Sequence, residues 1–436
     1  MKRILKWLLF IWFILNIFNA PIRYYLYKFG ISWLIYISDV ILIVMIGYGL
    51  LMIIRSMRIS RLFLFIIVII LFSTFIGFVN QLRFLQILFG IKVFLPLLAG
   101  LVVTKYNIIQ HKHFISIYRI FIPIIIIGLV LEHIQVIPWK GFSYNLGGFT
   151  IEGNRAWTTF GIPRLSGFQR ASFETAIILF FLDMFYLLNI YIRKTKIKIK
   201  WVLYDALLFV LSIIGIIYTT SKTIYLAEGT LIIISVILIL WSKVNDKVFR
   251  RLILVTVKLI LFFLLLFAVI PPVISFVLPD YINDIILSDN YFTKLLFTSY
   301  IDRMVSTWPD AYSLNNYTYF SLFGRGIGAI GAPQKYFESN LYNPGDNIFV
   351  YLNLTFGWIV LLFLIFWIII HLIKINMNHS KDISLIFFLL SVFSIGATLN
   401  GLESSTFALS IGMLLSNYYE IPFHNNENDR RLGFHV

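Results

Sequence analysis

Residues 62–79 read LFLFIIVIILFSTFIGFV, an apolar run of 18 residues without a charged side chain. A helix needs roughly 20 mostly apolar residues to cross the hydrocarbon core of a bilayer. Eleven further segments meet this requirement, which gives twelve predicted spans: 4–20, 31–54, 62–79, 84–103, 114–137, 172–191, 201–219, 223–241, 252–277, 347–372, 383–399 and 404–419. The apolar residues come in unbroken runs rather than in alternating strands, which disfavours a β-barrel. The sequence therefore predicts an all-α polytopic membrane protein.

The composition agrees with this class. Hydrophobic residues make up 60% of the 436 positions, and charged residues make up only 13%, about half the share in an ordinary soluble domain. So few charges cannot cover a water-soluble core of this size, which excludes soluble enzymes, secreted scaffolds, disordered chains and coiled coils. The chain has no cysteine, which excludes disulfides, thiolate nucleophiles, thiolate zinc sites and iron–sulfur clusters.

The positions of Lys and Arg predict the orientation, because cytoplasmic loops are enriched in both residues. With the N-terminus inside, every predicted inner segment carries at least two basic residues. We therefore place both termini in the cytoplasm. We interpret residues 4–20 as an uncleaved anchor, since Asn19-Ala20-Pro21 is a poor cleavage site. Residues 1–419 then form one transmembrane domain, and residues 420–436 form a cytoplasmic tail.

Two predicted outer loops, 138–171 and 278–346, are much longer than the others. Outer basic residues run against the insertion bias, so those in the two loops require a reason. One reason is ion pairing with acids such as Glu152, Asp302, Asp310 and Glu338, and the other is binding of an anionic ligand. The basic residues concerned are Lys140, Arg155, Arg164, Arg170, Lys294, Arg303, Arg325 and Lys335.

Arg164 and Arg170 flank Gly167 where the first long loop returns to the membrane, and Glu174 follows. Arginine presents a planar fork that matches phosphate oxygens, and the start of the next helix adds backbone N–H donors. We expect an anion cradle at the level of the lipid headgroups. The alternative is that both arginines snorkel to bind lipid headgroups directly.

Two further outer cations stand in distinctive surroundings. Lys222 lies in the tight turn Thr219-Thr220-Ser221-Lys222-Thr223, where it serves either as an anion ligand or as an interfacial anchor. Arg325 lies within Gly324-Arg325-Gly326-Ile327-Gly328, and glycine allows the backbone to approach a ligand closely. No βαβ unit surrounds these glycines, which argues against a nucleotide-binding loop. We expect a flexible loop that presents Arg325 to a ligand.

Asp346 and Asn347 precede the span from 347 to 372, where Asp is a common helix N-cap. Capping alone explains them as well as ligand binding does. Taken together, the outer side offers four or five cations, a glycine loop and one or two carboxylates near the bilayer surface. That combination suits a lipid-linked pyrophosphate better than a transported ion, because fixed cations stabilise a departing pyrophosphate.

These segments, in this order, resemble the Wzy-type O-antigen and capsular polysaccharide polymerase family, which is related to the O-antigen ligases. Arg164-Leu165-Ser166-Gly167-Phe168 through Ala176 resembles the family's Arg-x-x-Gly-x-Phe…Ala segment, with Ala171-Ser172 in place of an acid–Pro pair. Thr220-Ser221-Lys222-Thr223 resembles its Ser-Arg-Thr turn, with Lys for Arg. The glycine loop, Asp346-Asn347 and Gly357 resemble the segment before a late span.

The resemblance implies a GT-C-like glycosyltransferase in the bacterial cytoplasmic (inner) membrane that joins oligosaccharide repeat units carried on undecaprenyl pyrophosphate. It also implies a chain-length regulator as a partner. Arg164, Arg325 and Asp346 are then predicted catalytic residues, and Arg170, Lys222, Arg303, Glu174 and Asn347 are predicted to bind pyrophosphate or sugar. We expect no metal, because the outer loops lack histidine and cysteine and their acids are scattered. We also expect no cofactor and no nucleic-acid partner.

Two alternatives remain open. Ligases of this superfamily carry a histidine where this chain has Asp346, so the sequence favours a polymerase over a ligase. The general base stays undecided between Asp346, Glu174 and none. A lipid-linked oligosaccharide flippase is the other alternative, and the intramembrane charges Asp39, Lys92, Asp183, Asp205 and Glu228 are compatible with it.

Overall fold

The computed structural model describes residues 2–56, 60–106, 111–135, 137–159, 161–193, 199–277 and 291–420. The predicted cytoplasmic tail beyond residue 420 lies outside the described residues, as do residues 278–290 of the second long loop.

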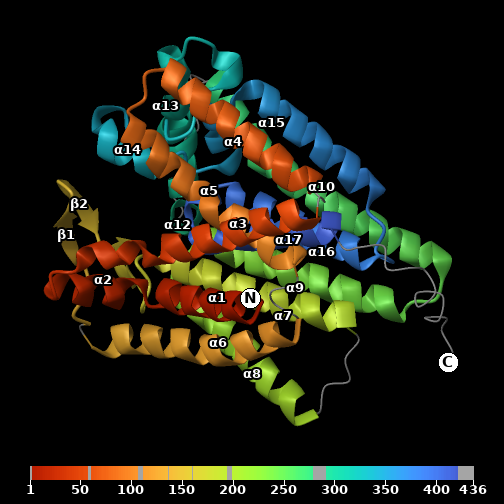
Figure 1. Cartoon of the computed structure of the whole chain (residues 1–436). Coiled ribbons are helices and arrows are strands. Elements are labelled where there is room, and N and C mark those ends of the chain that lie inside the picture. Colours follow the sequence, from red (N-terminus) through yellow and green to blue (C-terminus); the bar gives the residue numbers. More distant parts are fainter. Residues whose placement is uncertain are drawn as a thin grey trace.

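The chain forms an all-α bundle of the polytopic membrane class (Figure 1). In the part that the structure describes, nine helices, α3 to α10 and α15, are long and apolar enough to cross a membrane. The long helices are α1 (Lys2–Ile17), α2 (Asn19–Lys28), α3 (Ile37–Ser56), α4 (Arg61–Val79), α5 (Phe84–Lys105), α6 (His111–Ile134), α7 (Ser172–Arg193), α8 (Ile199–Tyr218), α9 (Lys222–Lys243), α10 (Lys247–Val277), α15 (Ile348–Lys374), α16 (Ser380–Gly396) and α17 (Ser405–Glu420).

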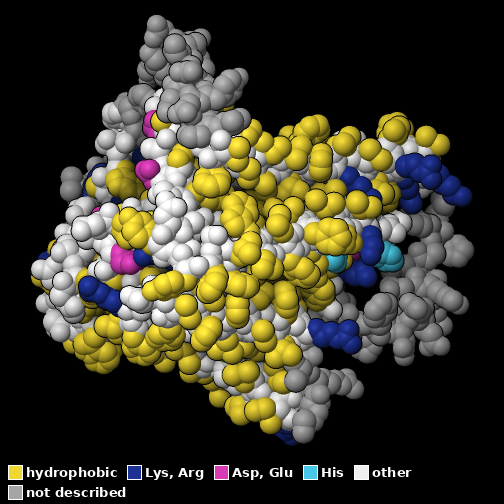
Figure 2. Space-filling model, turned by 90° about the horizontal axis from the view of Figure 1, so that it is seen from above, with side chains coloured by type: hydrophobic (Ala, Val, Ile, Leu, Met, Phe, Trp, Pro, Cys, Tyr) yellow, Lys and Arg dark blue, Asp and Glu magenta, His cyan; other side chains and the backbone are white. Residues whose placement is uncertain are grey.

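The surface has the pattern expected of a protein in a bilayer. Hydrophobic side chains cover the middle of the face in Figure 2, while Lys, Arg, Asp and Glu side chains gather toward its two ends. Large apolar side chains on α4, α8 and α10 are more than half exposed, among them Leu71, Leu203 and Phe263. Such a surface is stable against lipid tails rather than against water.

The first predicted span is not one straight helix. α1 ends at Ile17, and α2 starts at Asn19 with its axis bent by 82°. Pro21 has no N–H to donate within a continuous helix and its ring crowds the preceding turn. The carbonyls of Asn16 and Ile17 instead accept hydrogen bonds from the Gln169 side chain, at 2.6 and 3.2 Å. The loop before α7 therefore holds the bend in place.

The last two predicted spans form short helices at the centre of the fold. α16 has 17 residues and α17 has 16, so each is about 25 Å long, against about 30 Å of hydrocarbon. Residues 382–396 of α16 are all buried. α5 packs against α17 through Gly100 and Gly412, where an added Cβ atom would overlap the backbone of the other helix. Small residues allow such close packing of membrane helices, and it brings the start of α17 beside α5.

Both long loops contain ordered structure. The first forms two antiparallel hairpins, β1 (Ser143–Leu146) with β2 (Phe149–Glu152), and β3 (Trp157–Thr159) with β4 (Ile162–Arg164). β1 and β2 lie at the left in Figure 1, beside α2. The second loop contains α12 (Tyr291–Asp302), a π-helical turn (Arg303–Thr307), α13 (Trp308–Ser313) and α14 (Ala332–Phe337). A 3₁₀ turn, Gly401–Glu403, joins α16 to α17.

Candidate functional site

A cavity of about 740 Å³ opens where the ends of several helices meet. The end of α1 lines it, together with the starts of α3, α5, α7 and α9, both long loops, and the turn between α16 and α17. In the topology predicted from the basic residues, every one of these positions lies on the outer side. Segments that are far apart in sequence therefore lie together at one end of the helix bundle.

The cavity brings together six of the eight predicted site residues. Arg325 and Asn347 do not line it. The six come from the first loop, the start of α7, the α8–α9 turn and the second loop, and they are Arg164, Arg170, Glu174, Lys222, Arg303 and Asp346.

Arg164, Lys222 and Arg303 form a group of three cations, which we call the cation group. They lie close enough for their charges to act on one another. The buried Nε of Arg164 has no hydrogen-bond partner among the described residues. Burial lowers the pKa of the Arg164 guanidinium; Tyr225 opposes this effect in part, and the charge of Arg303 adds a smaller lowering. The protein thus concentrates positive charge that it does not fully neutralise at Arg164.

Two local features place the cation group. Arg164 ends β4, where it lies opposite Trp157 across the hairpin, with its guanidinium carbon 5.6 Å from the centre of the Trp157 ring. Lys222 follows Thr220, which has a φ of 52°. A β-branched residue rarely adopts this left-handed conformation, and such strain is concentrated at functional sites.

Asp346 is the carboxylate partner of Arg303. The Nε of Arg303 donates to Oδ2 of Asp346 at 3.1 Å, and a second guanidinium nitrogen donates to the Ser299 carbonyl at 2.9 Å. Asp346 does not cap α15. Asn347 does so, because its side-chain oxygen accepts from the N–H groups of Phe349 and Val350.

Asn347 lies among the helices and does not line the cavity. It is fully buried. Its amide nitrogen donates to the carbonyls of Ala268 in α10 and Ala397 after α16, each at 2.8 Å. The structure therefore places Asn347 away from the cavity, where its side chain caps α15 and ties that helix to α10 and to the end of α16.

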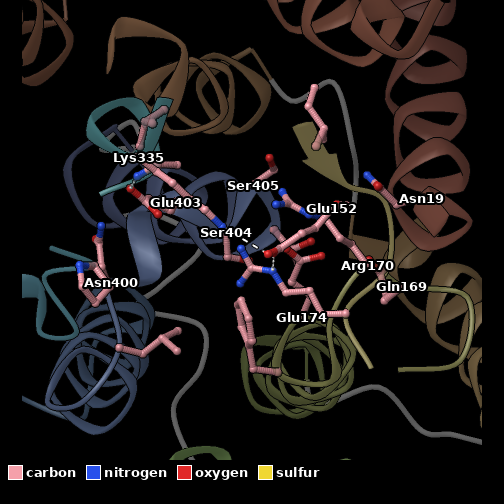
Figure 3. Close-up of a pocket in the computed structure, with 18 of the residues that line it drawn as sticks. Asn19, Glu152, Gln169, Arg170, Glu174, Lys335, Asn400, Glu403, Ser404 and Ser405 are labelled. Carbon is pink, nitrogen blue, oxygen red and sulfur yellow. Dashed lines mark hydrogen bonds and ion pairs between the residues drawn. The ribbon is translucent and has the colours of Figure 1, made fainter. Parts of the chain in front are cut away.

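A second charged cluster surrounds Glu152 at the end of β2 (Figure 3). Glu152 accepts from the Arg155 Nε at 2.6 Å and from the Lys335 Nζ at 3.2 Å, while its backbone carbonyl accepts from the Arg170 Nε at 2.9 Å. Burial raises the pKa of the Glu152 carboxyl, but Arg155 and Lys335 outweigh it and hold that pKa below its usual range. Glu174, in the first turn of α7, lies beside Arg170 and Glu152 in the same view.

Glu403 also lines the cavity, and sequence reasoning missed it. It ends the 3₁₀ turn before α17, and its Oε1 accepts a hydrogen bond from the Ala332 N–H at 2.6 Å. Burial raises the pKa of this carboxyl to about 7, although the Ala332 N–H and the charges of Arg155 and Arg170 favour the ionised form. The available signal was a single acid in the short turn between the last two predicted spans.

Arg325, a predicted catalytic residue, does not line the cavity. Its side chain is 4% exposed, and a guanidinium nitrogen lies 2.7 Å from Oε1 of Glu338. Another guanidinium nitrogen donates to the Ala329 carbonyl at 3.2 Å, and its backbone N–H donates to Leu354 at 2.7 Å. Arg325 therefore holds its own loop against α14 and α15.

The glycines around Arg325 serve the same packing. Gly324, Gly326 and Gly328 all have positive φ. An added Cβ atom at Gly324 would overlap the backbone of α15 at Gly357, and one at Gly326 would overlap Gly77 in α4. The loop around Arg325 therefore packs tightly between α4 and α15. It does not match the expectation of a flexible loop that presents Arg325 to a ligand.

In the described ranges, no group of three or more His, Cys, Asp or Glu residues is arranged to hold a metal ion. Neither a protein-family model, nor a curated protein, nor a solved structure matches the chain. Function must therefore be argued from the chemistry of the cavity.

Proposed function

We propose that this chain is a membrane glycosyltransferase that joins oligosaccharide repeat units carried on undecaprenyl pyrophosphate. It acts at the outer face of the bacterial cytoplasmic membrane and contributes to O-antigen, capsule or exopolysaccharide synthesis. The observation that supports this is the cation group: Arg164, Lys222 and Arg303 come from three separate parts of the chain and line one cavity. Neutral ligands do not require such a concentration of positive charge, whereas a pyrophosphate does.

The cation group matches the leaving group of a polymerase. In the proposed reaction, a hydroxyl oxygen of one lipid-linked unit attacks the anomeric carbon of the growing chain, and a new C–O bond forms. The bond from that carbon to the pyrophosphate oxygen breaks, and its electron pair stays on the oxygen. Preorganised cations stabilise the charge that develops there. Cleavage of the bond between the donor sugar and its pyrophosphate supplies the free energy for the transfer, so the step requires no nucleotide.

The rest of the cavity suits sugars. Glu152, Glu174 and Glu403 can accept hydrogen bonds from sugar hydroxyls. Trp157 and Tyr336 also line the cavity, and aromatic rings offer apolar faces against which the C–H faces of a sugar ring can pack. One site thus contains groups for both parts of a lipid-linked oligosaccharide.

A deletion strain distinguishes this function from its alternatives. Cells that accumulate single repeat units on the final acceptor support a polymerase. Polymer that is complete but unattached points to a ligase, and lipid-linked repeat units trapped on the cytoplasmic side point to a flippase. The direct assay uses purified protein in lipid vesicles with lipid-linked repeat units as substrate. Longer chains must appear with wild-type protein and not with protein-free vesicles.

A chain-length regulator is the expected protein partner under this proposal. Adding it to the vesicles should change the distribution of chain lengths without being needed for the bond-forming step.

A further inference from the structure

We infer that Glu403 is the general base that takes the proton from the attacking sugar hydroxyl. This inference rests on the proposed glycosyl transfer and names a catalytic residue for it. Glu403 touches the cavity directly, at the turn where α16 gives way to α17.

One oxygen of Glu403 is fixed by a backbone N–H. Oε1 accepts the Ala332 N–H at 2.6 Å, which orients the carboxylate. The hydrogen bond that the described residues give to the Glu403 carboxylate is this one, to Oε1. Gly331, with a φ of 78°, makes room for the carboxylate, because a Cβ atom there would overlap Oε1. Gly331 and Ala332 therefore hold the Glu403 side chain in place at the wall of the cavity.

Two other cavity carboxylates already have cations as partners. Glu152 is held by Arg155 and Lys335, and Asp346 is held by Arg303. A cation at hydrogen-bond distance favours the ionised carboxylate and weakens its pull on a further proton.

The surroundings of Glu403 tune its proton affinity in the opposite direction. The charged and titratable groups that act on it are Arg155 and Arg170 from the first loop and Asp346 from the second, with Tyr342 and Tyr351 beside it. Burial dominates and raises the pKa of Glu403 to about 7. A general base works best when its pKa lies near the operating pH.

The complete step balances as follows. The acceptor hydroxyl oxygen bonds to the donor's anomeric carbon while the hydroxyl proton passes to Oε2 of Glu403. The anomeric carbon releases the lipid pyrophosphate, which keeps the electron pair next to the cation group. Glu403 then returns its proton to water, and the carboxylate is ready for the next unit.

A purely structural role for Glu403 makes a different prediction from a base. As a structural residue, it would only cap the six-residue helix α14 through the Ala332 N–H. Glu403→Gln keeps a side-chain oxygen for that hydrogen bond but cannot accept the proton. The substitution therefore separates the two roles.

The experiment compares wild type, Glu403→Gln and Asp310→Asn in vesicles with lipid-linked repeat units. Asp310 is an exposed acid of α13 in the second long loop that does not line the cavity, so its variant is the control. Initial rates of chain extension are measured at pH values on both sides of 7. General base catalysis contributes roughly 100- to 10,000-fold, so Glu403→Gln should lose at least about 100-fold in kcat with little change in KM. Wild type should lose rate as the pH falls through about 7, and the residual rate of the variant should lack this dependence.

The outcomes separate the two proposals. If wild type extends chains and Glu403→Gln does so at a similar rate or with the same pH profile, the role of Glu403 is wrong and the proposed function stands. If wild type makes no polymer, both are wrong. If Glu403→Gln does not fold, Glu403→Asp replaces it. Glu403→Asp keeps a carboxylate on a shorter side chain, so it should lower kcat and still lose rate as the pH falls (the acid limb of the pH profile). A variant with unchanged kcat and no acid limb would overturn the inference.

Discussion

Replacing Arg164 with alanine should reduce catalysis without reducing stability. The Arg164 Nε is buried and has no hydrogen-bond partner among the described residues, and burial together with Arg303 disfavours the charge. The main described contact that alanine removes is the one with the Trp157 ring, and a cation–π contact contributes about 0.5–1 kcal/mol at such sites. Relief of repulsion within the cation group offsets part of that loss. We therefore expect the free energy of unfolding to change by less than about 1 kcal/mol.

The rate should change much more. Removing one preorganised donor from a developing oxyanion typically lowers the rate by about 100- to 1,000-fold, equivalent to about 2.7–4 kcal/mol. Arg164→Ala should therefore leave mostly single repeat units. Arg164→Lys should recover part of the rate only, because lysine keeps the charge but lacks the bidentate fork.

The assay follows chain length against time in vesicles, and thermal unfolding of the same preparations in detergent. Arg83→Ala is the matched control, since Arg83 is an exposed arginine at the start of α5 that does not line the cavity. Wild-type rates in Arg164→Ala would refute the assigned site. A loss of rate accompanied by an equal loss of stability would refute the reasoning in another way, because Arg164 would then serve folding.

Three other predictions follow from the same structure. Arg325→Ala should lower the free energy of unfolding by about 3 kcal/mol, the typical effect of breaking a buried ion pair, while the folded fraction keeps its specific activity. Gly331→Ala should displace Glu403 and impose strain of about 1–3 kcal/mol, so its extension rate should fall while the acid limb of the pH profile remains. Reporter fusions after Asn316 and after Lys243 should read as outside and inside respectively, and a cytoplasmic signal at Asn316 would overturn the topology.

The helical architecture was predictable because long apolar runs leave a chain few options. In a bilayer every backbone N–H and C=O must be satisfied within the protein, and a helix does this locally. The bend after Ile17 was not predictable in the same way. Pro21 marks the position, but the bend also depends on Gln169, which lies about 150 residues away in sequence and bonds the carbonyls that the break releases.

The arginines show where local pattern fails. Arg164 and Arg325 both lie in outer loops next to glycine, and sequence reasoning gave them the same role. Glycine permits close approach of the backbone to any neighbour, whether a ligand or another helix. Gly77 and Gly357 stand inside apolar helices, and the loop around Arg325 packs against them. The segment after Arg164 packs in the same way, because Gly167 lies against Gly128 in α6. What separates the two arginines is the position of the side chain: Arg325 pairs with Glu338, whereas Arg164 lines the cavity.

Glu403 escaped notice because the significance of a carboxylate depends on its surroundings rather than on its neighbours in sequence. The turn that carries it is three residues long and would pass for a simple connection between two helices. Its seat is made by Gly331 and Ala332, about 70 residues earlier, and the close packing of α5 on α17 fixes the turn beside the cavity. The cations Arg155 and Lys335 are engaged by Glu152 and not by Glu403. The same cavity thus keeps one carboxylate paired and ionised and another seated by a neutral N–H donor. This difference allows neighbouring acids of one site to divide the binding of a sugar from the removal of its proton.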